Sequence, residues 1–407
     1  MIGWNCHKKE VGMKIPNVHS LFNISNIYLL LWCLYYIQGT IYPMGSIIPR
    51  ICLVLVLLIT LYYWVQCFQK YRIPTPLRVL NILIFTFFVY ALFYQLYGNF
   101  AFRSFDGFKY TAVDNIRTLI ASMLPVYPIY LFTIKGYLNK KNIRVWFFVF
   151  LVVATFQFFA YESARLEMSI YDTDGLTNNI SYYFLALLPL VFLYRKSKIL
   201  MYVCILYIMC FLVYGMKRGA ILIGFCVILY IIYKDFKNSS VRKKMLISIL
   251  VTLVSVFVVK YIMDLAASSN YFQYRLEQTL EGESSGRDSY YHFFFEHFFN
   301  ENDIIKILFG GGAYYTVKLN GNLAHNDWLE LLTNQGLLGM SLLFAYWITW
   351  SRYILRIRNS QYFPVLFSSF LVFFVKSLMS MSIMDTLIYG MLPIGYCLGC
   401  IYNKEQL

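Results

Sequence analysis

Charged side chains are scarce in this sequence. Asp, Glu, Lys and Arg make up 14% of the 407 residues, whereas hydrophobic residues make up 59%. A typical soluble domain contains about 25% charged residues, so this composition excludes an ordinary soluble protein. Long apolar runs recur along the whole chain and predict an all-α polytopic membrane protein.

Other features are also missing. The polar, basic segment 1–20 leads into the first apolar run without a small-residue cleavage site, so we expect no cleaved signal peptide. Eight of the nine cysteines lie in apolar runs and Cys6 lies in the N-terminal segment, which argues against a disulfide framework. Cys397 and Cys400 form a C-x-x-C pattern, but they lie inside an apolar run, where packing is the expected role.

We predict about twelve membrane-spanning helices. Several apolar runs are shorter than the ~20 residues needed to cross a bilayer core, so the helices are expected to extend into the loops. The spans divide the chain into spans 1–9 (1–263), one long polar loop (264–336), and spans 10–12 with a tail (337–407). The apolar runs are 21–42, 47–68, 77–97, 114–134, 144–161, 179–194, 199–215, 219–233, 245–263, 337–351, 362–381 and 385–402.

Basic residues give the expected orientation. If the N-terminus is cytoplasmic, the inner segments contain 22 of the 35 basic residues, as the positive-inside rule requires. Both termini would then be cytoplasmic. The loop 264–336 would lie outside, and it contains ten acidic and four basic residues. The net charge of +15 is therefore attributed to topology and not to nucleic-acid binding.

The long loop is predicted to contain an aromatic helix over 287–299, lying on the membrane surface or against the bundle. His292 and Glu296 share a face of this helix and His297 follows, which suggests a metal site. The spacing departs from the H-x-x-E-H metal motif, and no further ligand set is apparent. We therefore favour packing for these residues and expect no metal and no cofactor.

A second short helix is predicted over 328–335. Asn326 or Asp327 is the expected N-cap, and Gly336 is expected to end the helix. The three glycines at 310–312 are not a phosphate loop, because no Lys-Ser/Thr pair follows them. They are expected to allow a close approach of two backbones.

Three short pieces carry a family resemblance. The first is Lys217-Arg218-Gly219-Ala220, and the second is Gly286-Arg287 before the aromatic helix. The third comprises the three glycines, Ala324-His325-Asn326, Leu329 and Gly336-Leu337-Leu338-Gly339. Together they resemble the O-antigen polymerase and O-antigen ligase superfamily of bacterial inner-membrane proteins. The resemblance covers about 180–340, and the first five spans are similar only in hydropathy and topology.

The resemblance implies a glycosyltransferase of the C type (GT-C), working outside the cytoplasm on glycans carried by undecaprenyl diphosphate. Polymerases of the superfamily join lipid-linked repeat units, so that the lipid-linked oligosaccharide is both donor and acceptor. Ligases transfer the chain to lipid A-core. The compact loop favours a polymerase, with a ligase as the alternative, although an R-x10-G double-arginine pattern is absent at Arg165, Arg218 and Arg287. A chain-length regulator and a flippase are the implied protein partners.

Arg218 and Arg287 are the predicted ligands of the diphosphate. A guanidinium stays cationic, donates two hydrogen bonds to phosphate oxygens, and stabilises charge that grows on a leaving group. Lys217, Asn326 and Gly311 are the other predicted substrate contacts. Alternatively, Lys217 and Arg218 only anchor a helix end against lipid headgroups. The alternative for Arg287 is that it forms a solvated ion pair with a nearby carboxylate.

His325 is the predicted general base, because imidazole exchanges protons near neutral pH. Asp327 or Glu330 would orient its ring, and the alternative is a histidine that caps the following helix. Lys376 lies within the eleventh span, where it either snorkels or faces the lipid-diphosphate cavity.

The rival function from another class is a polysaccharide or lipid transporter. Few buried ionisable groups and the lack of an internal repeat argue against it.

Overall fold

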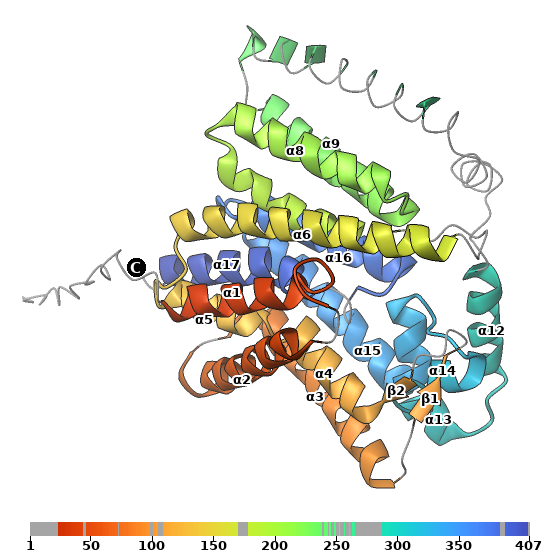
Figure 1. Ribbon diagram of the computed structural model, residues 1–407. Coiled ribbons are helices and arrows are strands. Elements are labelled where there is room, and N and C mark those ends of the chain that lie inside the picture. Colours follow the sequence, from red (N-terminus) through yellow and green to blue (C-terminus); the bar gives the residue numbers. More distant parts are fainter. Residues whose placement is uncertain are drawn as a thin grey trace, which may run out of the picture.

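The computed structural model of the chain is almost entirely helical (Figure 1). It describes residues 23–43, 46–71, 73–97, 101–104, 109–169, 178–237, 240–242, 287–382 and 387–405, with scattered residues between 244 and 264. Its elements are α1 (Ile24–Tyr36), α2 (Ile47–Lys70), α3 (Thr75–Tyr97), β1 (Ala101–Arg103), β2 (Lys109–Thr111), α4 (Ala112–Ser122), α5 (Val126–Ile134), α6 (Lys140–Ser169), α7 (Ser181–Leu187), the 3₁₀ helix η1 (Leu188–Tyr194), α8 (Lys198–Tyr214), α9 (Arg218–Lys237), α12 (Arg287–Phe299), α13 (Ile304–Phe309), α14 (Tyr315–Asn320), α15 (Asp327–Arg356), α16 (Phe363–Met379) and α17 (Leu387–Glu405).

Within the described ranges, six helices are long and apolar enough to cross a membrane, and four more are apolar but shorter. The chain is therefore a membrane-embedded helical protein. The predicted span 245–263 falls largely outside the described residues. The six long helices are Ile47–Gln69, Thr75–Phe93, Val113–Ile134, Lys140–Ser163, Arg218–Lys237 and Asp327–Arg356.

Two predicted spans are not single regular helices. The run 114–134 is divided into α4 and α5, with Pro125 as the residue before α5. The run 179–194 begins as α7 and continues as the 3₁₀ helix η1, with Pro189 in its first turn. Proline lacks the backbone N–H that an uninterrupted α-helix requires. Both interruptions of the helix occur at a proline.

The all-helical prediction also missed a short hairpin. Strands β1 and β2 pair antiparallel, with Ala101 opposite Thr111 and Arg103 opposite Lys109. Thr111 then caps α4, because its hydroxyl accepts from the N–H of Asp114 and the Asp114 carboxylate accepts from the N–H of Thr111. Strands of three residues are too short for the two-residue alternation that identifies a strand in sequence.

The core lies between closely packed helices. α17 packs along α5, and α1 contacts both α5 and α6 (Figure 1). A Cβ on Gly395 would stand 2.8 Å from the carbonyl oxygen of Val126, and one on Gly399 would stand 2.9 Å from that of Tyr130. These glycines therefore permit the close helix contact that is typical of membrane bundles. Cys397 is buried between them, as the packing interpretation expected.

Helix α15 connects the membrane bundle to the polar elements beside it. It is broken at Gly336, whose φ of 63° is non-helical, so that 327–335 forms a separate short helix before the long apolar part. α12, α13 and α14 pack on α15, at the right of Figure 1. The predicted aromatic helix over 287–299 and the glycine stop at Gly336 are both confirmed.

Candidate functional site

The three glycines at 310–312 bind the short helix of α15 through their backbones. Gly311 N–H donates to the carbonyl of Thr333 at 3.0 Å, and Gly312 N–H donates to that of Asn334 at 2.9 Å. Gly310 has a φ of 74°, and a Cβ there would stand 2.4 Å from the backbone of Asn334. The predicted close backbone approach is confirmed. Gly311 is a predicted substrate contact, and its backbone N–H forms this hydrogen bond within the protein.

The carboxylate of Glu330 holds the segment 310–326, which we call the His325 loop. It accepts hydrogen bonds from the hydroxyl of Thr316 at 2.7 Å, the N–H of Ala324 at 2.8 Å and the side-chain amide of Asn334 at 2.8 Å. Glu330 is only 3% exposed. A buried carboxylate is costly unless several donors surround it. Two of these donors, Thr316 and Ala324, belong to the loop, and the third, Asn334, belongs to α15. Glu330 thus acts on the backbone immediately before His325.

His325 itself has a left-handed backbone, with φ 53°. Among the described non-glycine residues, Met216 and Tyr314 also have positive φ. Such conformations cost of order 1–3 kcal/mol and persist only where the surroundings hold them. One lies at His325 and another directly before the Lys217-Arg218 pair, so two strained positions coincide with two of the predicted site segments.

Asn326 caps the helix after His325. Its side-chain oxygen accepts from the N–H of Trp328 at 2.8 Å and of Leu329 at 3.2 Å, and its amide nitrogen donates to the carbonyl of Leu378 at 2.9 Å. The N-cap prediction is confirmed. The oxygen and the nitrogen of the Asn326 side-chain amide therefore both form hydrogen bonds within the protein. The sequence had predicted only a substrate contact and a helix cap for this residue.

The same cap region is attached to the end of α16. The indole N–H of Trp328 donates to the hydroxyl of Ser377 at 3.2 Å. The carboxylate of Asp327, which is buried, accepts from the N–H of Ser382 at 2.8 Å. With the bond from Asn326 to Leu378, these contacts fix the start of α15 against residues 377–382.

Lys376, one residue before this attachment, is 3% exposed and lies with its ammonium 4.4 Å from the centre of the Tyr182 ring. A cation over an aromatic face is stabilised by the ring quadrupole. The Tyr182 hydroxyl lies against α9, since a Cβ on Gly219 would stand 2.8 Å from it. Contacts therefore run from the His325 loop through α16 and Tyr182 to the start of α9, where Lys217 and Arg218 lie.

Arg287 is the first residue of α12, and its side chain lies outside the described part of the structure. Helix α12 packs beside the His325 loop, because Phe294 is fully buried in a cluster with Ala324, Leu329 and Leu332. The backbone of Arg287 is about 10 Å along the helix from Phe294. The structure thus brings the element that carries Arg287 to the His325 loop.

The possible metal residues on α12 contact side chains within the protein. His292 Nδ1 lies 3.2 Å from the Glu296 carboxylate, and both side chains are largely exposed. The ring of His297 stacks on Phe293 and lies near Tyr315. Across the described residues, no group of three or more His, Cys, Asp or Glu side chains could hold a metal ion.

Sequence reasoning missed Tyr182 and the loop contacts of Thr316. Nothing local distinguishes one tyrosine among 37. The contacts through α16 and Tyr182 connect the loop that carries His325 to Lys376 and to the start of α9, where Lys217 and Arg218 lie. That arrangement is suited to binding an anionic group and to moving a proton.

No family model matches this chain, and no curated protein matches it significantly.

Proposed function

We propose that this protein is a membrane glycosyltransferase that joins oligosaccharide repeat units carried on undecaprenyl diphosphate. It would be a polymerase of the O-antigen type with a GT-C architecture of about twelve spans, acting at the outer face of the bacterial inner membrane. One observation carries the proposal. The His325 loop is held by the buried carboxylate of Glu330 and attached to α16, whose Lys376 contacts Tyr182 beside the start of α9.

In the proposed reaction, a hydroxyl of the acceptor sugar attacks the anomeric carbon of the donor. The new O–C1 bond forms as the bond from C1 to the diphosphate oxygen breaks, so the configuration at C1 is inverted. His325 takes the proton of the hydroxyl. Arg218 and Arg287 hydrogen-bond the departing undecaprenyl diphosphate, whose negative charge grows in the transition state.

The rigid support of His325 favours this role over a passive one. A general base contributes only when it is held within hydrogen-bond reach of the proton that it removes. The bonds from Thr316 and Ala324 to Glu330, the Asn326 cap and the attachment to α16 all restrict the backbone around His325. A helix cap alone would not require this support, because Asn326 already caps α15.

The experiment is a deletion strain complemented with variants of the full chain. Loss of a polymerase leaves lipid A-core that carries a single repeat unit. Loss of a ligase leaves core without any repeat while lipid-linked polymer accumulates, and that result would replace the proposal with the ligase. If His325→Ala and Arg287→Ala proteins reach the membrane and still support full-length glycan, the catalytic roles proposed for these residues are wrong.

A further inference from the structure

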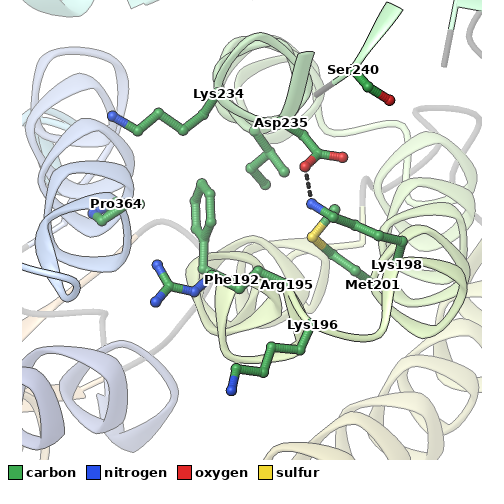
Figure 2. A pocket seen from close by; sticks show the side chains of 10 residues that line it. Phe192, Arg195, Lys196, Lys198, Met201, Lys234, Asp235, Ser240 and Pro364 are labelled. Atoms are coloured by element: carbon green, nitrogen blue, oxygen red, sulfur yellow. Dashed lines mark hydrogen bonds and ion pairs between the residues drawn. The ribbon is translucent and has the colours of Figure 1, made fainter. Parts of the chain in front are cut away.

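A cavity of ≈ 400 Å³ opens at the far end of α9 from Arg218 (Figure 2). The lining residues Ile231, Lys234 and Asp235 lie about 20–26 Å along α9 from Arg218, so the cavity is at the opposite end of this helix from Lys217 and Arg218. The volume is in the range typical of small-molecule sites. The lining residues are Phe192, Arg195, Lys196, Lys198, Met201, Ile231, Lys234, Asp235, Ser240 and Pro364.

The cavity has an excess of positive charge. Four basic side chains and one carboxylate line it. That carboxylate, Asp235, forms an ion pair with Lys198 and accepts a hydrogen bond of 2.8 Å from the hydroxyl of Tyr202. With four cations and one carboxylate, the lining as a whole therefore has a positive net charge. In Figure 2 the side chains of Arg195 and Lys234 extend on the side of the cavity toward Pro364.

Apolar surface accompanies these cations. Phe192, Met201, Ile231 and Pro364 contribute the apolar part of the lining. Outside it, Ile199 on α8 is 82% exposed and Tyr233 on α9 is 60% exposed. In a membrane protein, large apolar side chains with this exposure face lipid chains. A ligand that places an anionic group among the cations can thus continue as an acyl chain along α8 and α9.

We propose that this cavity binds the phosphate headgroup of an anionic membrane phospholipid. Arg195 can donate two hydrogen bonds to phosphate oxygens, and Lys234 adds a point charge beside them. Basic pockets between transmembrane helices recognise anionic headgroups in this way. The competing explanation is that these residues only orient the protein by the positive-inside rule, which requires no cavity and no preference among phospholipids.

The test uses the purified full chain and native mass spectrometry, with phosphatidylglycerol and phosphatidylcholine as the two probes. The wild-type protein is expected to retain phosphatidylglycerol in preference to phosphatidylcholine. Arg195→Gln with Lys234→Gln should weaken phosphatidylglycerol binding about tenfold or more, since each charge near a headgroup contributes substantially. Arg195→Lys retains the charge but loses the paired donors. Its affinity for phosphatidylglycerol should therefore lie between those of the wild type and the double variant.

The matched control is Arg356→Gln with Arg358→Gln. These two exposed residues lie at the end of α15 that is remote from the His325 loop, and the substitutions remove the same charge. The control should bind phosphatidylglycerol within about twofold of wild type. Equal weakening in both double variants, or equal retention of the two lipids by the wild type, would overturn the proposal. A further arm adds inorganic diphosphate to the lipid-bound protein. If diphosphate displaces no phosphatidylglycerol, the result supports the proposal. If the protein binds diphosphate but no phosphatidylglycerol, the result contradicts the proposal. None of these outcomes depends on glycosyl transfer.

Discussion

The buried carboxylate of Glu330 accepts a 2.8 Å hydrogen bond from the backbone N–H of Ala324, the residue before His325. The same carboxylate is bonded to Thr316 and Asn334. A single side chain of α15 thus connects the start of α14, the end of the His325 loop and its own helix. The conformation of the loop is expected to depend on this carboxylate.

We predict that Glu330→Gln destabilises the loop by about 1–3 kcal/mol, because an amide nitrogen would face donors that need an acceptor. The backbone N–H of Ala324 should lose protection from hydrogen exchange. Glu296→Gln, at an exposed contact with His292, is the control and should change stability by less than about 0.5 kcal/mol. Unchanged protection of Ala324 in Glu330→Gln would show that this bond does not hold the loop.

Gly336→Ala is predicted to be more damaging than an ordinary glycine substitution. Gly336 has a φ of 63°, and a Cβ there would stand 2.6 Å from the N of Gly310 and from the carbonyl oxygen of Ile307. With its ψ of −154°, Gly336 lies in a backbone region that is essentially restricted to glycine, where alanine costs about 1–3 kcal/mol. Displacement of the Gly310 backbone adds to this cost. Gly321→Ala, at a φ of 62° and a ψ of 5°, measures the ordinary cost of alanine in the left-handed region. Equal decreases in the thermal unfolding midpoint of the two variants would contradict the steric argument.

His325→Asn should separate the chemistry of His325 from its backbone. Asparagine adopts the left-handed conformation more readily than most residues, so the loop should keep its structure while the imidazole is lost. We expect the rate of repeat-unit polymerisation to fall about 100- to 10,000-fold, the range of a general base, without a change in the unfolding midpoint. His297→Asn, on α12, should retain activity. A His325→Asn protein with the wild-type rate would exclude His325 as the base.

Tyr182 is predicted to support Lys376 through its ring. Tyr182→Leu removes the aromatic face 4.4 Å from the ammonium, whereas Tyr182→Phe keeps it. The leucine variant should therefore be less stable than the phenylalanine variant by about 1–3 kcal/mol, from the lost cation–π contact and the altered packing. Thermal unfolding in lipid nanodiscs measures this difference. If the two variants unfold at the same temperature, the ring does not stabilise the lysine.

The turn between α12 and α13 gives a prediction about pH. The pKa of Glu301 is lowered, first by the backbone N–H of Asp303 and then by its hydrogen bond with Lys306, and the pKa of Lys306 is raised by the same bond. A lowered carboxyl pKa stabilises the folded turn above the ordinary value of ~4.3. That contribution is lost as the pH falls through the folded-state pKa.

Lys306→Met should therefore raise the pKa of Glu301 toward its ordinary value without reaching it, because the N–H of Asp303 remains. Carbon-detected NMR titration of the Glu301 carboxyl group measures the shift. Lys318→Met, which removes a lysine of α14, should leave the Glu301 titration unchanged. The ion pair has no role in the lowered pKa if Lys306→Met also leaves it unchanged.

Local signals in the sequence determined several features of this protein. Hydropathy identified a helical membrane protein, and most helix positions followed from the apolar runs. The aromatic helix 287–299, the cap at Asn326 and the break at Gly336 were all predicted correctly. The cap depends on a side chain that accepts from the next backbone N–H groups within one helical turn, and a glycine marks a position where a helix commonly ends. Such short-range chemistry can be recognised from residue types and spacing.

Only the tertiary structure decided what these elements contact. The ring of Tyr182 lies beneath Lys376, the Asn326 amide donates to Leu378, and Arg195 and Lys234 share a cavity. All three contacts join residues that are far apart along the chain. Long-range contacts result from the packing of helices against one another and leave no periodic pattern in the sequence. The sequence therefore identified His325 and Arg218 as candidates, whereas the fold revealed how the His325 loop is connected, through α16 and Tyr182, to the start of α9.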